Sequence, residues 1–134
     1  MSLIKAKQSM NNLEEALERL GEALAIKEEE NTLVVDATIQ RFEFVIELYW
    51  KTLKRLLELE GIQTYTPIEM LKASYTVHWL DDETIWLQML NDRNKTSHIY
   101  DAEMTNQIYQ NIKSYYPVLS STYRFLKDRF TAES

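Results

Sequence analysis

The polar side chains between residues 91 and 101 hold the chemistry that this sequence offers most clearly. Arg93 is a fixed cation, and His98 is the kind of side chain that can move a proton near neutral pH. Arginine can grip a phosphate through two parallel hydrogen bonds. With the amide of Asn94 beside them, these residues suit metal-independent cleavage of RNA by its own 2′-hydroxyl. The histidine would handle a proton, and the arginine would stabilise charge on the phosphorane.

These side chains can converge only where a helix is interrupted. On an unbroken helix, Arg93 and His98 would lie about 140° apart around the axis. The hydrophobic pattern stops near Asn94, and Asp101 is placed to cap a new helix, so we predict a break between them. The alternative is that an arginine, a histidine and a tyrosine in a polar loop are ordinary surface residues, and spacing alone leaves both interpretations open.

Three further charged residues could support such a site. Glu43 and Lys51 belong to a polar strip on the second predicted helix, and Asp92 directly precedes Arg93. For Glu43, Glu47 and Lys51 the simpler interpretation is surface ion pairs, and a place in the site is the alternative. Glu47 and Lys51 in particular stand four residues apart, in the order that favours a pair.

Other kinds of site have little support in the sequence. There is no cysteine, and His98 has no acidic or histidine neighbours at metal-ligand spacing, so we predict no metal and no cofactor. The second histidine, His78, lies beside Trp79 at a helix end, where we expect a packed or helix-stabilising role. The net charge of −6 disfavours tight, non-specific binding of nucleic acid, but it allows a short local contact with RNA or a basic partner.

Two long helices are predicted in the first half of the chain, over about residues 5–28 and 34–60. Gly21 should weaken the first helix slightly, and Gly61 is a natural C-terminal cap for the second. Apolar residues cover so much of the second helix that it should be central in a bundle. They are Ile39, Phe42, Phe44, Val45, Ile46, Leu48, Tyr49, Trp50, Leu53, Leu56 and Leu57.

Helix-start signals recur in the second half of the chain. Residues 66–69, Thr-Pro-Ile-Glu, form a capping box that opens a short helix over about 67–77, and the acids at 81–83 open the next one. Asp101 can cap a last long helix, which Pro117 should kink or divide. The apolar positions of that helix are Ile108, Ile112, Tyr115, Leu119, Phe125 and Leu126.

The composition fits one helical domain over residues 1–134. Gly and Pro number two each, and 45% of the residues are hydrophobic, which is enough for a core at this length. We therefore predict an all-α, antiparallel up-and-down bundle of about five helices. Because no apolar run approaches the roughly 18 residues of a membrane span and no leader is evident, we expect a cytoplasmic protein.

The spacing Arg93-x4-His98-x-Tyr100 resembles the R-x4-H-x-Y signature of HepT-type HEPN proteins. Residues 39–54 and 86–98 also look like the corresponding segments of the nucleotidyltransferase substrate-binding subset of that family. The likeness covers about residues 33–115.

This resemblance implies a homodimeric helical bundle whose partner is a small, MntA-like nucleotidyltransferase. It implies that Arg93, Asn94 and His98 correspond to the ribonuclease site, and that Tyr100 is the tyrosine to which the nucleotidyltransferase antitoxin adds AMP. One histidine cannot be general base and general acid together, whereas a dimer could bring two near one phosphate. AMP placed two residues from His98 would put bulk and negative charge where the RNA phosphate must sit.

Three hypotheses follow from the sequence. The first is a HepT-like toxin that cleaves RNA until its antitoxin modifies it. The second is a non-catalytic, substrate-binding subunit of a two-component nucleotidyltransferase, in which catalysis belongs to the other chain. The third is a structural bundle whose polar loop has no chemical role.

Overall fold

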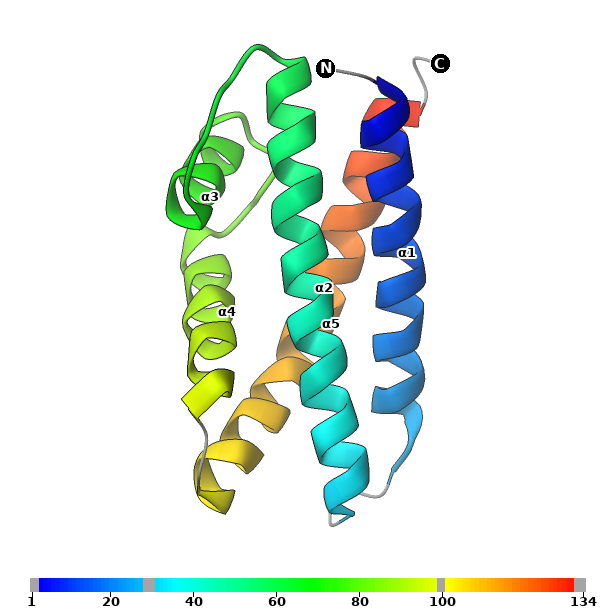
Figure 1. Ribbon diagram of the computed structural model, residues 1–134, viewed down its shortest axis with the longest axis vertical. Coiled ribbons are helices and arrows are strands. Elements are labelled where there is room, and N and C mark those ends of the chain that lie inside the picture. Colours follow the sequence, from blue (N-terminus) through cyan, green and yellow to red (C-terminus); the bar gives the residue numbers. More distant parts are fainter. Residues whose placement is uncertain (1–2, 28–30, 99–100, 132–134) are drawn as a thin grey trace.

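The computed structural model describes residues 3–27, 31–98 and 101–131, and within them every regular element is helical (Figure 1). The elements are α1 (Leu3–Ala25), α2 (Thr32–Leu59), α3 (Pro67–Thr76), α4 (Glu83–Lys95), the short 3-10 helix η1 (Thr96–His98) and α5 (Ala102–Thr131). The prediction of an all-α bundle with five α-helices is thereby confirmed.

Helix α2 is the central element, because it packs against α1, α3, α4 and α5 (Figure 1). Its apolar stripe from Ile39 to Leu57 is buried, as predicted, while Leu48 and Trp50 are half-buried. Two phenylalanines expected in the core are not there: Phe44 is 54% exposed and Phe125 is 44% exposed. In each case the next residue, Val45 or Leu126, occupies the buried position, and successive helix positions point in different directions.

Gly21 has a packing role that the sequence did not reveal. A Cβ atom at this position would collide with the phenol of Tyr116 on α5. The Tyr116 hydroxyl donates a hydrogen bond to the carbonyl of Leu17 at 3.3 Å, one turn earlier on α1. The small helical penalty of a glycine therefore permits α5 to approach α1 closely.

Pro117 does not divide α5, which runs unbroken from Ala102 to Thr131. Contacts to other helices hold α5 on both sides of the proline. Tyr116 binds the Leu17 carbonyl of α1, and the Tyr49 hydroxyl of α2 donates to the carbonyl of Leu119. These contacts and the buried apolar residues of α5 outweigh the one backbone hydrogen bond that a proline removes.

Most of the predicted caps are present. Asp82 and Asp101 accept from the backbone N–H groups of Thr84 and Met104 at 2.9 and 3.0 Å. Thr66 accepts from the N–H of Glu69 at 3.1 Å. The Glu69 carboxylate, however, accepts from the N–H of Tyr65 rather than from that of Thr66, so the capping box is displaced by one residue.

Helices α2 and α3 end in the same hydrogen-bonding motif with different residues at its left-handed position. After α2, Gly61 has a φ of 81° and its N–H donates to Glu58, while Ile62 donates to Leu57. After α3, His78 takes the equivalent place with a φ of 68°, donating to Tyr75. Both arrangements are Schellman motifs. His78 is therefore an exposed helix terminator rather than a packed residue.

None of the helices in the described ranges is long and apolar enough to cross a membrane.

Replacing His78 by glycine should stabilise the fold, because a left-handed backbone costs a non-glycine residue about 1 kcal/mol or more. We expect His78→Gly to raise the free energy of unfolding by about 1 kcal/mol in urea denaturation. Gly61→Ala is the matched control at the equivalent position and should lower it by a similar amount. A destabilised His78→Gly protein would contradict the strain that we infer.

Candidate functional site

The helix break predicted between Asn94 and Asp101 is present. Helix α4 ends at Lys95, η1 occupies Thr96–His98, and α5 begins at Ala102. Tyr100, the candidate for modification by AMP, lies outside the described residues.

Arg93 is held between α4 and α2 by two glutamates. Its Nη2 lies 2.6 Å from Glu47 Oε1, and its Nη1 lies 3.6 Å from Glu43 Oε2. The arginine side chain is 20% exposed, and its buried Nε has no hydrogen-bond partner among the described residues. Two carboxylates around one guanidinium fix its position and more than balance its charge.

Thr96 connects the start of η1 to the same cluster. Its Oγ1 lies 2.7 Å from Glu43 Oε2 and 2.6 Å from the carbonyl oxygen of Arg93. The single hydroxyl proton can serve one of these acceptors at a time. The turn that follows α4 is therefore tied to α2 through Glu43, which gives this predicted supporting residue a clear structural role.

Asn94 and His98 lie at the exposed edge of this turn. The carbonyl of Asn94 accepts a hydrogen bond from Ser97 Oγ at 3.1 Å, and both the Asn94 and His98 side chains are exposed. Within the described part of the chain, His98 forms no hydrogen bond or ion pair. The structure thus joins Arg93 to Glu43, whereas the His98 side chain is exposed on the surface.

Asp92 points toward α5, whereas Arg93 points toward Glu43 and Glu47 of α2. Its Oδ2 accepts hydrogen bonds from Asn111 Nδ2 at 3.0 Å and from the Tyr115 hydroxyl at 2.6 Å, and the residue is 6% exposed. Burial and this carboxylate together raise the pKa of Tyr115 well above its usual value, so the phenol keeps its proton and remains a donor. Asp92 therefore connects α4 to α5 and does not enter the Arg93 cluster.

Lys51 is exposed on α2 and does not reach the Arg93 cluster by any ion pair of the described residues. The pair expected between Glu47 and Lys51 does not form, because Glu47 binds Arg93. The sequence favours a surface ion pair for Glu47 over a place in the site, whereas the structure sets Glu47 directly against Arg93. Its spacing of four residues from Glu43, which puts two carboxylates on one face of α2, was the available signal.

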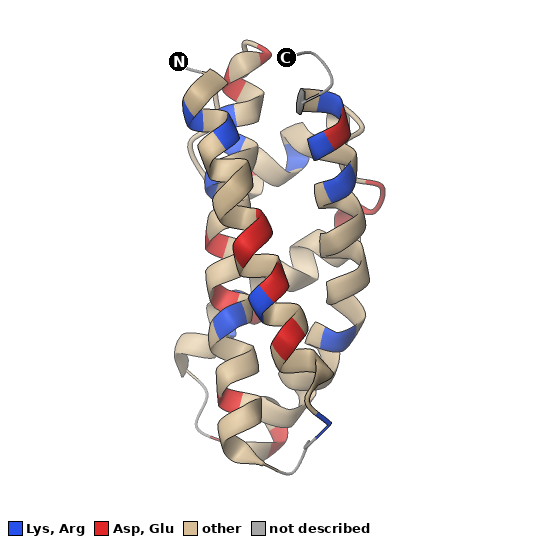
Figure 2. Cartoon of the chain, turned by 90° about the vertical axis from the view of Figure 1, so that its right-hand side faces the viewer, with Lys and Arg blue, Asp and Glu red and all other residues tan. Residues whose placement is uncertain are grey.

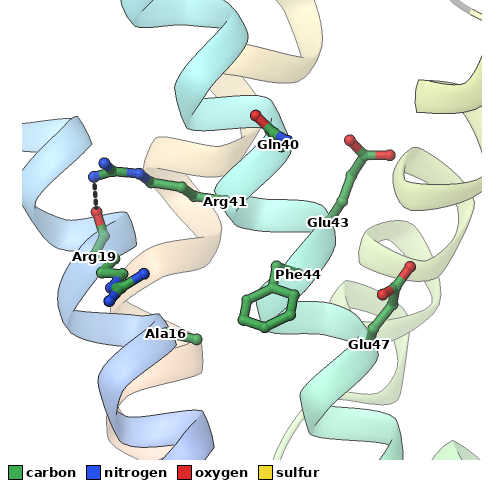
Figure 3. A pocket seen from close by; sticks show the side chains of 7 residues that line it. All are labelled: Ala16, Arg19, Gln40, Arg41, Glu43, Phe44 and Glu47. Atoms are coloured by element: carbon green, nitrogen blue, oxygen red, sulfur yellow. Dashed lines mark hydrogen bonds between the residues drawn. The ribbon is translucent and has the colours of Figure 1, made fainter.

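A surface pocket of about 470 Å³ adjoins the two glutamates between α1 and α2 (Figure 3). Figure 3 shows Phe44 in the middle, with Arg19 and Arg41 on one side and Glu43 and Glu47 on the other. Arg41 Nη1 donates to the carbonyl of Arg19 at 2.7 Å, which holds the arginine side together. The half-exposed ring therefore lies between clusters of opposite charge.

Comparison with known proteins identifies the family to which this chain belongs. A family model described as nucleotidyltransferase substrate binding protein like matches residues 8–128. A Haemophilus influenzae protein named probable ribonuclease HepT is 34% identical over 91 residues, which are 64% of this chain and 62% of that relative's length.

Two solved structures share the fold. A Thermus thermophilus protein has a TM-score of 0.80 and 29% identity, covering 86% of this chain and 98% of its own. A Haemophilus influenzae protein, described as revealing the fold of a substrate binding domain of a nucleotidyltransferase, has a TM-score of 0.67 and 25% identity, covering 94% and 99%. The resemblance seen in the sequence is confirmed: this chain is a HepT-type, HEPN-like protein and belongs to the nucleotidyltransferase substrate-binding family.

Proposed function

We propose that this protein is the HepT-like toxin of a cytoplasmic toxin–antitoxin pair and acts as a metal-independent endoribonuclease. The observation that carries the proposal is the anchored Arg93, held by Glu43 and Glu47 next to an exposed turn that bears Asn94 and His98. The relative named probable ribonuclease HepT supports the same interpretation.

In the proposed reaction, the 2′-oxygen of one ribose attacks the adjacent phosphorus and the bond to the 5′-oxygen breaks. The products are a 2′,3′-cyclic phosphate and a 5′-hydroxyl. One His98 takes the proton of the 2′-hydroxyl, and Arg93 stabilises charge on the phosphorane. Glu43 and Glu47 keep the guanidinium in place before RNA binds, so binding of the substrate need not order the Arg93 side chain.

The second proton transfer needs another acid, and we assign it to His98 of a second copy in a homodimer of two antiparallel up-and-down bundles. The exposed face of α2 is the surface that we propose for this contact. Leu33 is 77% exposed and Phe44 is 54% exposed on this helix. A two-fold contact centred on Phe44 would set the arginine side of one copy against the glutamate side of the other (Figure 3).

The partner in this proposal is an MntA-like nucleotidyltransferase that silences the toxin by adding AMP to Tyr100. The added phosphate would carry negative charge close to His98 and oppose the approach of an RNA phosphate. The family description, nucleotidyltransferase substrate binding protein like, supports a nucleotidyltransferase as the partner.

A second candidate function is a non-catalytic subunit that binds substrate for that nucleotidyltransferase. Two observations favour it. The charge of Arg93 is already compensated by two carboxylates, and acidic and basic residues are interspersed over the side of the molecule in Figure 2. A freely RNA-binding enzyme usually presents a more uniform basic surface.

Cleavage should depend on His98 and not on the protein's other histidine. Purified protein incubated with RNA in EDTA should produce 2′,3′-cyclic phosphate ends, and His98→Ala should lower the rate by at least about 100-fold. His78→Gly is the control, since it removes an exposed histidine far from Arg93 in sequence. Equal rates for wild type and His98→Ala would exclude cleavage through this site.

Co-expression with an MntA-like nucleotidyltransferase should add one AMP to Tyr100. Tandem mass spectrometry of the purified protein measures this, and Tyr100→Phe should abolish the addition, whereas Tyr65→Phe should not, although Tyr65 is 78% exposed. A stable complex in which Tyr100 stays unmodified would favour the substrate-binding subunit.

Phe44→Ser should weaken the dimer, because it removes the central apolar contact of the proposed interface. Light scattering after size exclusion should show a shift from dimer to monomer at micromolar concentration. Phe125→Ser, at a comparably exposed phenylalanine on α5, should leave the mass unchanged. A dimer that survives Phe44→Ser but not Phe125→Ser would place the interface elsewhere.

A further inference from the structure

A second, smaller pocket lies between α2 and the connection to α3. Its volume is about 150 Å³, and it is lined by Trp50, Lys51, Lys54, Thr64, Tyr65, Thr66, Pro67 and Met70. The pocket lies about one helical turn from the candidate site, toward the C-terminal end of α2. Lys51 follows Glu47 by one turn, and Glu47 binds Arg93. The pocket and the Arg93 cluster are thus consecutive features of one helix.

The two lysines of the pocket are available to an anion. Lys51 and Lys54 are both exposed, and neither forms an ion pair with another described residue. Glu47 stands one turn from Lys51 on α2, and Glu58 stands one turn from Lys54, so both pairs have the spacing of an ion pair. Glu47, however, forms its ion pair with Arg93. Two exposed ammonium groups in the lining of a pocket, without an ion pair among the described residues, suit a phosphate.

The remaining wall offers aromatic surface and a hydroxyl. Tyr65 is 78% exposed, and Trp50 is half-buried beside it in the lining. Thr64 is 4% exposed, and its Oγ1 has no hydrogen-bond partner within the described residues. A buried hydroxyl without a partner destabilises the folded state, so such groups in native proteins call for a ligand or water nearby.

We propose that this pocket binds one nucleotide unit of a single RNA strand, with the phosphate at Lys51 and Lys54 and the base against Tyr65 and Trp50. Aromatic stacking combined with cations that follow the backbone is the usual way in which proteins hold single-stranded nucleic acid. Because the bound strand would be the substrate, the inference rests on the proposed ribonuclease function. It assigns Lys51 to substrate binding at a distance from the reacting phosphate.

The test is binding of a fluorescently labelled oligouridine to the full chain, measured by anisotropy in the His98→Ala background so that no strand is cut. Lys51→Gln with Lys54→Gln should weaken binding about tenfold. The same change should reduce the slope of log affinity against log salt by about 1.4, the value for two lost contacts with a single strand. Lys27→Gln with Lys72→Gln removes the same charge from exposed positions elsewhere and should change affinity by less than about twofold.

The stacking part of the proposal is tested at one exposed residue. Tyr65→Ala should weaken binding about tenfold, whereas Tyr65→Phe, which keeps the ring, should bind like the parent protein. Thermal unfolding of each variant verifies that the fold is retained. Unchanged affinity in the Lys51 and Lys54 double variant, or equal losses in both lysine pairs, would overturn the inference.

Free uridine monophosphate distinguishes a strand from a mononucleotide as the ligand. The strand should bind at least about tenfold more tightly than the mononucleotide, and equal affinities would overturn the assignment to RNA. Failure of the proposed ribonuclease would be seen separately, as absent cleavage by the wild-type protein, and the binding measurements do not depend on cleavage.

Discussion

The contact between Arg93 of α4 and the glutamates of α2 is the constraint on which the candidate site depends. The arginine and Glu47 are 20% and 45% exposed, and a pair this accessible contributes about 1 kcal/mol or less to stability. Its importance is therefore positional. It sets where the guanidinium lies relative to the turn that carries Asn94 and His98, and Thr96 extends the same network into that turn through Glu43.

Two consecutive residues fasten α4 in two directions. Asp92 binds Asn111 and Tyr115 of α5, and Arg93 binds α2. Adjacent positions on a helix differ by about 100°, so the end of α4 is held on two sides at one level. This arrangement explains how α4, a short helix of modest amphipathicity, ends at a defined residue. The 3-10 turn of Thr96–His98 therefore starts from a helix end whose position is fixed.

Local rules predicted much of this structure from the sequence. Helix starts at Asp82 and Asp101, the glycine cap after α2 and the central place of α2 follow from capping and periodicity. The features that escaped prediction are those set by contacts between distant segments. Glu47 pairs with Arg93 rather than with Lys51, and Gly21 leaves space for the phenol of Tyr116. Helix α5 continues through Pro117 because contacts with α1 and α2 hold α5 on both sides of the proline. The end of α4 shortly after Arg93 was predictable, but the anchoring of Arg93 depends on Glu47, which lies 46 positions away in the chain.

A toxin that cuts RNA and a subunit that binds substrate differ in what the anchored arginine does. In the first, Glu47 acts only through Arg93, by holding it for the phosphorane; in the second, neither residue affects RNA chemistry. A double-mutant cycle on the cleavage rate separates these two functions most directly. If Glu47 positions Arg93 for cleavage, Glu47→Gln should slow the reaction about tenfold in the wild-type background and have almost no further effect in Arg93→Lys. Independent, multiplicative losses, or no loss from Glu47→Gln, would contradict this role of the anchored arginine.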